Sequence, residues 1–222
     1  MHVRKNNGGV KSLSGLLLIG GGGHCLTVIE ALKMNMFEKV GIIDSVENIG
    51  KQLSGIPFIG CDNDLKSLCS NYDSAFISLG SIGNWKKRES LSKKIKNLKY
   101  KIPIVIHPKA AVSETAQIAN GVLIGAMCVL NAYAEIGEMC ILNNGCIVEH
   151  NCIVEAYVHI SPGAVLCGGV HVGRGSHIGA GSVVKENISI GENSMIGIGS
   201  VVVSDIPDNV IAYGNPCRVQ EG

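Results

Sequence analysis

The sequence predicts two parts of different fold class: an α/β domain with a parallel sheet, followed by a parallel β-helix of hexapeptide repeats. Two patterns carry this prediction. An aliphatic residue recurs at every sixth position over the second half of the chain, and short apolar runs, a run of glycines and helix-like stretches precede it. The chain has 46% hydrophobic residues but only 4% aromatic ones, with 29 glycines, so its core must consist of Val, Ile, Leu and small residues.

The six-residue period extends from Ile106 to Val202. Every sixth residue over this stretch is aliphatic: Ile106, Val112, Ile118, Ile124, Leu130, Ile136, Leu142, Val148, Val154, Ile160, Leu166, Val172, Ile178, Val184, Ile190, Ile196 and Val202. The next position is often glycine, at 125, 137, 173, 179, 191 and 197. A hexapeptide period is a signature of parallel β-helices, and three hexads make a turn of about 18 residues. The coil is predicted to occupy residues 104–222.

The nine cysteines raise the question of a metal site or of disulfides. The position two before each aliphatic residue is mostly small, and it holds Cys128, Cys140, Cys146 and Cys152. Buried cysteines behave as small hydrophobes, which favours a packing role for these four. The other five show no C-x-x-C spacing, so the sequence indicates neither a zinc site nor a disulfide framework.

Residues 15–103 predict a Rossmann-like α/β domain. Short apolar runs indicate strands, and apolar residues at helical spacing indicate helices. The expected strands are 16–19, 40–44 and 75–79, and the expected helices are 24–36 and 84–98. Because strands and helices alternate, the sheet should be parallel.

Four glycines, 20–23, join the first strand to the first helix. Such a loop can present backbone N–H groups to a phosphate, or it can simply allow close packing. The dinucleotide fingerprint is imperfect, because Cys25 stands where its last glycine or alanine belongs. Asp44, at the end of the second strand, is a candidate for binding a ribose or base, or for capping a turn.

Charge and hydropathy exclude several partners. The net charge of +1 leaves no basic stripe for nucleic acid. No stretch approaches the ~18 apolar residues of a membrane span. The N-terminus does not resemble a signal peptide, so a cytoplasmic protein is expected. Residues 1–14 are polar and are predicted to form a flexible tail.

Together these motifs resemble one family. Gly-Gly-Gly-His at 21–24, the acid at 44, the [Leu/Ile/Val]-Gly-x4 repeats and the sequence Gly-Asn-Pro at 214–216 are similar to the bacterial nucleotide-sugar N-acetyltransferases and sialic-acid O-acetyltransferases, which are hexapeptide-repeat acyltransferases. The resemblance implies a left-handed parallel β-helix and a homotrimer with acetyl-CoA between neighbouring coils. It further implies acetyl transfer to the amino group of a UDP- or dTDP-linked 4-amino-4,6-dideoxy sugar. The residues implied to bind this sugar nucleotide are Gly22, Gly23, His24, Asp44, Ser45 and Gly80.

The reaction needs a base, and the repeat separates His150 from the other coil histidines. His150 lies two positions after an aliphatic residue, whereas His159, His171 and His177 each lie directly before one. Histidine titrates near neutral pH and is the usual general base. The resemblance assigns this role to His150 and usually places a carboxylate after it.

The residue after His150 is Asn151, which departs from that pattern. Its amide oxygen could orient the imidazole, but it adds no charge; Glu149 or Glu155 could supply the acid instead. The resemblance assigns His159, Gly168 and Ala180 to acetyl-CoA. His159 follows His150 by half of an 18-residue turn, so we expect the two histidines to approach each other only across a trimer interface.

Three alternatives fit the same residues. A sialic-acid O-acetyltransferase would use the same coil, although the missing carboxylate favours an amine acceptor. A γ-carbonic-anhydrase-like metal lyase would bind zinc between subunits through histidines such as His159 and His177, but it leaves the N-terminal domain without a role; we expect no metal. A non-catalytic scaffold would need the coil only for trimerisation.

Overall fold

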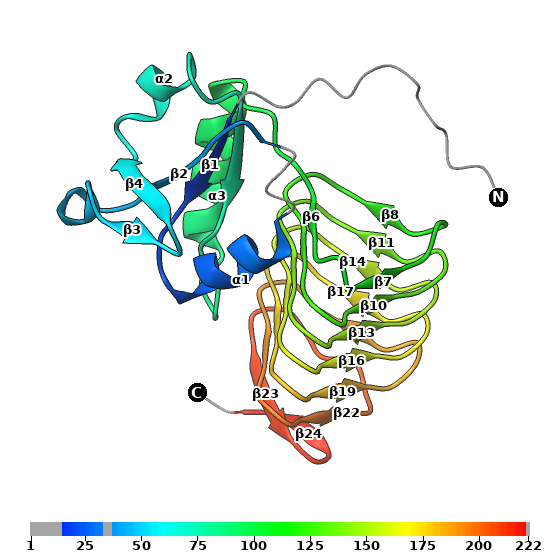
Figure 1. Ribbon diagram of the computed structural model, residues 1–222. Coiled ribbons are helices and arrows are strands. Elements are labelled where there is room, and N and C mark those ends of the chain that lie inside the picture. The colour runs from blue at the N-terminus through cyan, green and yellow to red at the C-terminus, as the bar shows by residue number, and fades with distance from the viewer. Residues whose placement is uncertain (1–14, 33–36, 221–222) are drawn as a thin grey trace.

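The computed structural model describes residues 15–32 and 37–220, which form an α/β domain seated on one side of a long coil (Figure 1). The predicted tail, 1–14, lies outside the described residues. The elements of the α/β domain are β1 (Leu16–Ile19), α1 (Gly23–Ala31), β2 (Val40–Ile43), the 3-10 helix η2 (Val46–Asn48), β3 (Gln52–Leu53), β4 (Ile56–Gly60), α2 (Leu65–Leu68), β5 (Ser74–Ile77) and α3 (Lys86–Asn97).

The sheet of this domain has the strand order β3-β4-β2-β1-β5. All neighbouring pairs are parallel except β3 with β4. Leu16 and Leu18 of β1 pack into the core beneath α1, whereas Leu17 and Ile19 pack into the core beneath α3. A central strand covered on both faces is apolar at every position, which explains the uninterrupted apolar run.

The predicted helices are longer than the observed ones. Leu32 is extended (φ −72°, ψ 132°), so α1 ends at Ala31, and residues 33–36 lie outside the described part of the chain. The second helix begins at Lys86 and ends at Asn97. The β3–β4 hairpin was not predicted; its turn places Ser54 and Gly55 at positive φ.

The coil has three faces, each a sheet that gains one parallel strand per turn; at the end of the domain face β24 pairs antiparallel with β23. The domain face, against the α/β domain, contains β6 (Val105–Ile106), β9 (Leu123–Ile124), β12 (Ile141–Leu142), β15 (His159–Ile160), β18 (His177–Ile178), β21 (Met195–Ile196), β23 (Ile211–Gly214) and β24 (Cys217–Val219). The valine face contains β7 (Ala111–Val112), β10 (Val129–Leu130), β13 (Ile147–Val148), β16 (Val165–Leu166), β19 (Val183–Val184) and β22 (Val201–Val202). The polar face contains β8 (Gln117–Ile118), β11 (Glu135–Ile136), β14 (Ile153–Val154), β17 (His171–Val172) and β20 (Ser189–Ile190).

The predicted six-residue period is confirmed. Each predicted aliphatic residue is the second residue of a strand from β6 to β22, and these side chains form the continuous core of the coil. The four cysteines in the small-residue phase are fully buried in the same core, and all nine cysteines are free. The interpretation of these four cysteines as packing residues is therefore correct.

The turns between strands explain the residue types at other positions of the six-residue repeat. From Gly121 to Gly199, every sixth residue has positive φ, and most of these positions are Gly or Asn. The glycines that directly follow an aliphatic residue have another role: they let the backbone of the next turn approach closely. A Cβ at Gly137 would lie 2.6 Å from the backbone nitrogen of Ala156, in the next turn.

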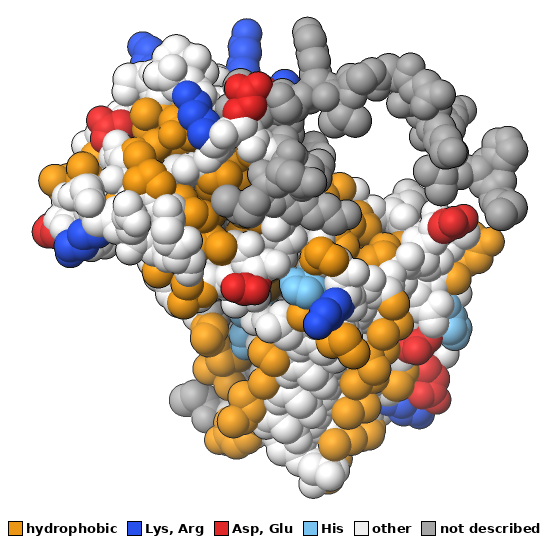
Figure 2. Space-filling view, in the orientation of Figure 1, with side chains coloured by type: hydrophobic (Ala, Val, Ile, Leu, Met, Phe, Trp, Pro, Cys, Tyr) orange, Lys and Arg blue, Asp and Glu red, His pale blue; other side chains and the backbone are white. Residues whose placement is uncertain are grey.

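The first residue of each strand points outward, so the outward side chains of stacked strands form a column on each face. The residue types in this column differ from face to face. On the domain face Leu123, Ile141, His159 and His177 are buried by the α/β domain. On the valine face all six outward residues are aliphatic, and none is buried. Figure 2 shows hydrophobic side chains running in columns down the front of the coil.

Candidate functional site

A cavity of about 470 Å³ opens at the edge of the sheet where β1 and β2 end. Its walls are formed by Ile19, Gly20, Ile43, Asp44, Ser45, Val46, Glu47, Cys61, Asp62, Asn63, Leu79, Lys87 and Leu91. This volume is typical of small-molecule sites, and ligands of open parallel sheets bind at this edge. Of the predicted sugar-nucleotide residues, Asp44 and Ser45 line the cavity.

Asp44 holds the glycine loop. Its carboxylate accepts hydrogen bonds from the backbone of Gly21 (2.5 Å) and Ser45 (2.7 Å) and from the side chain of Asn48 (3.2 Å). Partial burial acts to raise the pKa of Asp44, but these hydrogen bonds outweigh burial and hold the pKa below its ordinary value. Asp44 is thus a charged acceptor at the mouth of the cavity.

The four glycines divide between the two roles considered above. A Cβ at Gly20 would lie 2.3 Å from Leu79, and one at Gly21 would lie 2.2 Å from Phe58, so these two allow close packing. Gly22 caps the N-terminus of α1 and Gly23 begins it; both are exposed with open space around them. Free N–H groups at a helix start attract anions, so this pair can receive a phosphate.

Three histidines gather where the α/β domain meets the coil. The ring of His159 lies 4.9 Å from that of His177, edge to face, and 6.4 Å from that of His24. His159 Nδ1 donates to the carbonyl of Ser81 (3.1 Å), and the hydroxyl of Ser161 lies 3.2 Å from His177 Nε2. His159 and His177, which the metal-lyase alternative paired, lie opposite each other on adjacent strands, one turn apart.

Burial keeps all three imidazoles neutral. It lowers the pKa of His24 to about 4 and that of His159 to about 3, with additional repulsion from Arg88 in both cases. It also lowers the pKa of His177. Neutral imidazoles can accept a proton or a hydrogen bond, and His24 Nε2 is buried without a partner among the described residues. Gly80 lies beside His24, since a Cβ there would be 3.7 Å from that side chain.

His150 lies elsewhere, at the corner between the valine face and the polar face. Its side chain is exposed, and its Nδ1 lies 2.9 Å from the amide oxygen of Asn151. Because that oxygen can only accept, Nδ1 carries the proton and Nε2 has a free lone pair. Asn151 has φ +59°, the repeated left-handed turn position, where asparagine is favoured.

Gly168, one turn beyond His150, supports its ring. A Cβ at Gly168 would lie 2.6 Å from His150 Cε1, so the glycine leaves room for the imidazole. The structure therefore brings together His150, Asn151 and Gly168. Ala180 lies at a different corner, between the domain face and the valine face, and His159 lies within the domain face.

Comparison with known proteins identifies the family. The PglD N-terminal domain family matches residues 15–95. The perosamine N-acetyltransferase from Caulobacter crescentus, solved in complex with CoA and GDP-perosamine, is 34% identical, with a TM-score of 0.87 over 94% of this chain and 97% of that one. The acetyltransferase domain of PglB from Neisseria gonorrhoeae, in complex with acetyl coenzyme A, is 32% identical, with a TM-score of 0.87 over 93% and 99%.

The chain belongs to the nucleotide-sugar N-acetyltransferases of the hexapeptide acyltransferase family. It is an acetyl-CoA-dependent sugar N-acetyltransferase, and its coil is the left-handed β-helix that the resemblance implied. WeeI from Acinetobacter baumannii, at 24% identity and a TM-score of 0.80 over 92% of this chain and 99% of that one, shares the fold. Comparison with curated protein sequences gives no significant match.

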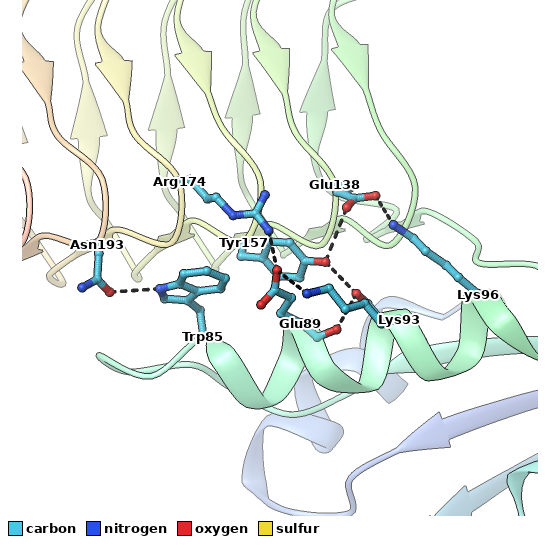
Figure 3. Close-up of polar contacts among 9 residues, drawn as sticks. Trp85, Glu89, Lys93, Lys96, Glu138, Tyr157, Arg174 and Asn193 are labelled. Atoms are coloured by element: carbon cyan, nitrogen blue, oxygen red, sulfur yellow. Dashed lines mark hydrogen bonds and ion pairs between the residues drawn. The ribbon is translucent and has the colours of Figure 1, made fainter.

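The α/β domain of this acetyltransferase is fastened to the coil along α3 (Figure 3). Trp85 Nε1 donates to the side chain of Asn193 (3.0 Å), and Arg174 pairs with Glu89 (2.8 Å). The Arg174 guanidinium also lies 4.7 Å from the ring centre of Tyr157. These contacts add to the packing of the α/β domain against the coil.

Sequence reasoning missed Arg88, Ser81 and the cavity residues Asp62, Asn63 and Lys87 of this acetyltransferase. Ser81 and the cavity residues have no sequence signal, because only the fold brings their segments to one edge. Arg88 had one: it shares the buried side of α3 with Leu91 and Ile95, where a charge is out of place.

Two further observations concern partners. In the described part of the acetyltransferase, no three His, Cys, Asp or Glu side chains are arranged to hold a metal ion. Among the same residues, no helix is long and apolar enough to cross a membrane.

Proposed function

We propose that this protein transfers the acetyl group of acetyl-CoA to the amino group of a nucleotide-linked 4-amino-4,6-dideoxy sugar, with His150 as the general base. The observation that carries the proposal is the state of His150: an exposed imidazole whose proton is held on Nδ1 by Asn151, so that Nε2 is free to accept one. Forms of the Caulobacter relative with one histidine replaced by Asn or Ala, solved with CoA and GDP-perosamine, support a histidine in this role.

The proposed reaction follows from this arrangement. The sugar amine attacks the thioester carbonyl, His150 Nε2 accepts the proton that the nitrogen loses, and the CoA thiolate leaves. Asn151 replaces the usual carboxylate as the group that orients the ring. The lack of a charge beside His150 is tolerable for an amine, which is a better nucleophile than a hydroxyl.

The sugar nucleotide is proposed to span the α/β domain. The cavity beside Asp44 and Ser45 would take the nucleoside, and Gly22 and Gly23 would receive phosphate at the start of α1. The sugar would then reach His24 and Gly80, next to the domain face. The family resemblance implied UDP or dTDP as the nucleotide, whereas the Caulobacter relative binds a GDP sugar, so all three must be tested.

A homotrimer would complete the site. The valine face is aliphatic and uncovered in one chain, and it is bordered by the His150 corner on one side and the Ala180 corner on the other. Threefold packing through this face would place the His150 corner of one subunit beside Ala180 and His159 of the next. Acetyl-CoA would lie between these two corners, in contact with Gly168, Ala180 and His159. Both substrates are cytoplasmic metabolites, which supports a cytoplasmic enzyme.

A substrate panel tests the proposal. The protein is incubated with acetyl-CoA and UDP-, dTDP- and GDP-linked 4-amino sugars, with CMP-sialic acid and free sialic acid as hydroxyl acceptors. Mass spectrometry follows the acetylated product, and a thiol reagent follows CoA. Acetylation of an amino sugar is expected. Acetylation of sialic acid alone would overturn the choice of an amine, and no transfer to any acceptor would overturn the function.

A further inference from the structure

A buried arginine joins the nucleotide domain to the coil behind the candidate site. Arg88 on α3 is 1% exposed, and its guanidinium donates to three backbone carbonyls, those of Ile77, Leu79 and Met139. Ile77 is the last residue of β5 and Leu79 follows it by two residues, whereas Met139 belongs to the coil. No Asp or Glu of the described residues forms an ion pair with Arg88, and its Nε has no partner there.

Packing alone does not account for an arginine at this place. Burial lowers the pKa of Arg88 to about 10, so the side chain still carries its charge at neutral pH. A buried charge without a counter-ion opposes folding, and a Leu or Met would fill the same side of α3 without that cost. What only a guanidinium provides is a planar fork that reaches several carbonyls at once.

The carbonyls that Arg88 binds lead directly to the site. The segment 78–81 has three anchors: Ser78 Oγ donates to the carbonyl of Gly20 (2.6 Å), Arg88 binds the carbonyl of Leu79, and the carbonyl of Ser81 binds His159. Leu79 lines the sugar-nucleotide cavity. Arg88 therefore holds a segment that lines the cavity at Leu79 and contacts a site histidine at Ser81.

We propose that Arg88 is a positioning residue for acetyl transfer, which holds segment 78–81 between the sugar-nucleotide cavity and His159 and ties both to the coil through Met139. The proposal rests on the proposed function. Because the Ser81 carbonyl can only accept, it fixes the proton of His159 on Nδ1 and leaves Nε2 as an acceptor. Without Arg88, segment 78–81 is free to shift, and both the cavity wall and the His159 tautomer lose their support.

Arg174 provides a matched control. It also bridges α3 and the coil, but at the surface, through Glu89 and the rings of Trp85 and Tyr157 (Figure 3). It touches neither segment 78–81 nor the cavity. Arg174→Met therefore removes a surface contact between α3 and the coil and leaves the contacts of segment 78–81 and of the cavity in place.

The experiment compares Arg88→Lys, Arg88→Met and Arg174→Met with the wild type in the full-length protein. Thermal melts first establish the folded fraction of each. For folded Arg88→Lys we expect the KM for the sugar nucleotide to rise about tenfold and kcat to fall about tenfold, as for loss of one hydrogen bond from a charged donor, while the KM for acetyl-CoA stays within about twofold. Lysine keeps the charge but cannot reach three carbonyls. A folded Arg88→Met should show the same changes, with the KM for the sugar nucleotide and kcat affected and the KM for acetyl-CoA unaffected; otherwise it should fail to fold. Arg174→Met should leave all three constants unchanged.

A nitrogen-15 NMR spectrum of the histidines gives a readout that does not require turnover. The wild type and Arg174→Met should show His159 protonated on Nδ1 and bare on Nε2, and Arg88→Lys should lose this pattern. Kinetic constants that change only with the folded fraction, an unaltered His159 signal in Arg88→Lys, or an equal effect of Arg174→Met would each overturn the proposal. Absence of turnover in the wild type would instead count against the proposed function. The NMR comparison would still test whether Arg88 controls the tautomer of His159.

Discussion

The domain face and the valine face of the coil share one backbone lattice and differ in their outward side chains and in what covers them. On both, the inward residues between Ile124 and Val202 are aliphatic and buried. Outward, the domain face carries His159 and His177 among Leu and Ile and is covered by the α/β domain, whereas the valine face is aliphatic along its whole length and open in one chain. The first face thus became an internal site, and the second has the composition of a subunit contact.

The corner beside the valine face should give the largest effect on activity. His150→Ala removes the proposed base without touching either face, so kcat should fall about a thousandfold, within the usual range for loss of a general base. Steady-state release of CoA thiol measures the rate, and size-exclusion chromatography with light scattering should show the wild-type assembly. An undiminished kcat would remove His150 from the role of base.

A charge on the valine face should break the proposed trimer. Ile147→Asp on β13 places a carboxylate in the middle of this face, where threefold packing would bury it at a cost of several kcal/mol. Light scattering should show monomers, and activity should fall about a hundredfold because His150 and His159 no longer meet.

Ile153→Asp on the adjacent strand β14 is the control for this change. Ile153 is the same residue type at the same strand position, but it lies on the polar face and is 46% exposed. This variant should keep both assembly and turnover. If Ile147→Asp remained trimeric, the valine face would not be the subunit contact.

The smallest effect concerns the histidines that are buried between the α/β domain and the coil. Their folded-state pKa values, about 4 for His24 and about 3 for His159, lie below the ordinary value of 6.5. Between these values the unfolded chain binds more protons than the folded one, so stability should fall as the pH drops below about 6.5. At pH 5 the loss should be roughly 1–2 kcal/mol for each of these histidines.

Urea unfolding at pH 7.5 and pH 5, at one protein concentration, measures this loss. His24→Gln should reduce the difference between the two pH values, because glutamine does not titrate. His171→Gln on the polar face, away from the three-histidine group, should leave it as in the wild type. Equal behaviour of the two variants would show that His24, buried between the α/β domain and the coil, does not set the acid sensitivity.

The sequence by itself determined the lattice of the coil and the strands around the glycine loop. Each hexad repeats the same local environment, so the position of a residue within the hexad decides whether its side chain points inward, lies in a turn or points outward. This was sufficient to interpret Cys146 as a core residue and to separate His150 from His159. In the α/β domain, a strand covered on both faces is apolar throughout, so 16–19 and 40–44 were recognisable without any partner.

Only the tertiary structure decided which of the three faces of the coil, with its outward-pointing side chains, the α/β domain covers. The six-residue period is the same on all three faces, so no phase could show that His159 lies beneath Ser81 while Ile147 stays open. The contacts of Arg88 with Leu79 and Met139 join residues far apart in sequence, through backbone carbonyls that place no demand on side-chain type. Such contacts depend on how the two parts pack together, and the sequence of either part does not contain them.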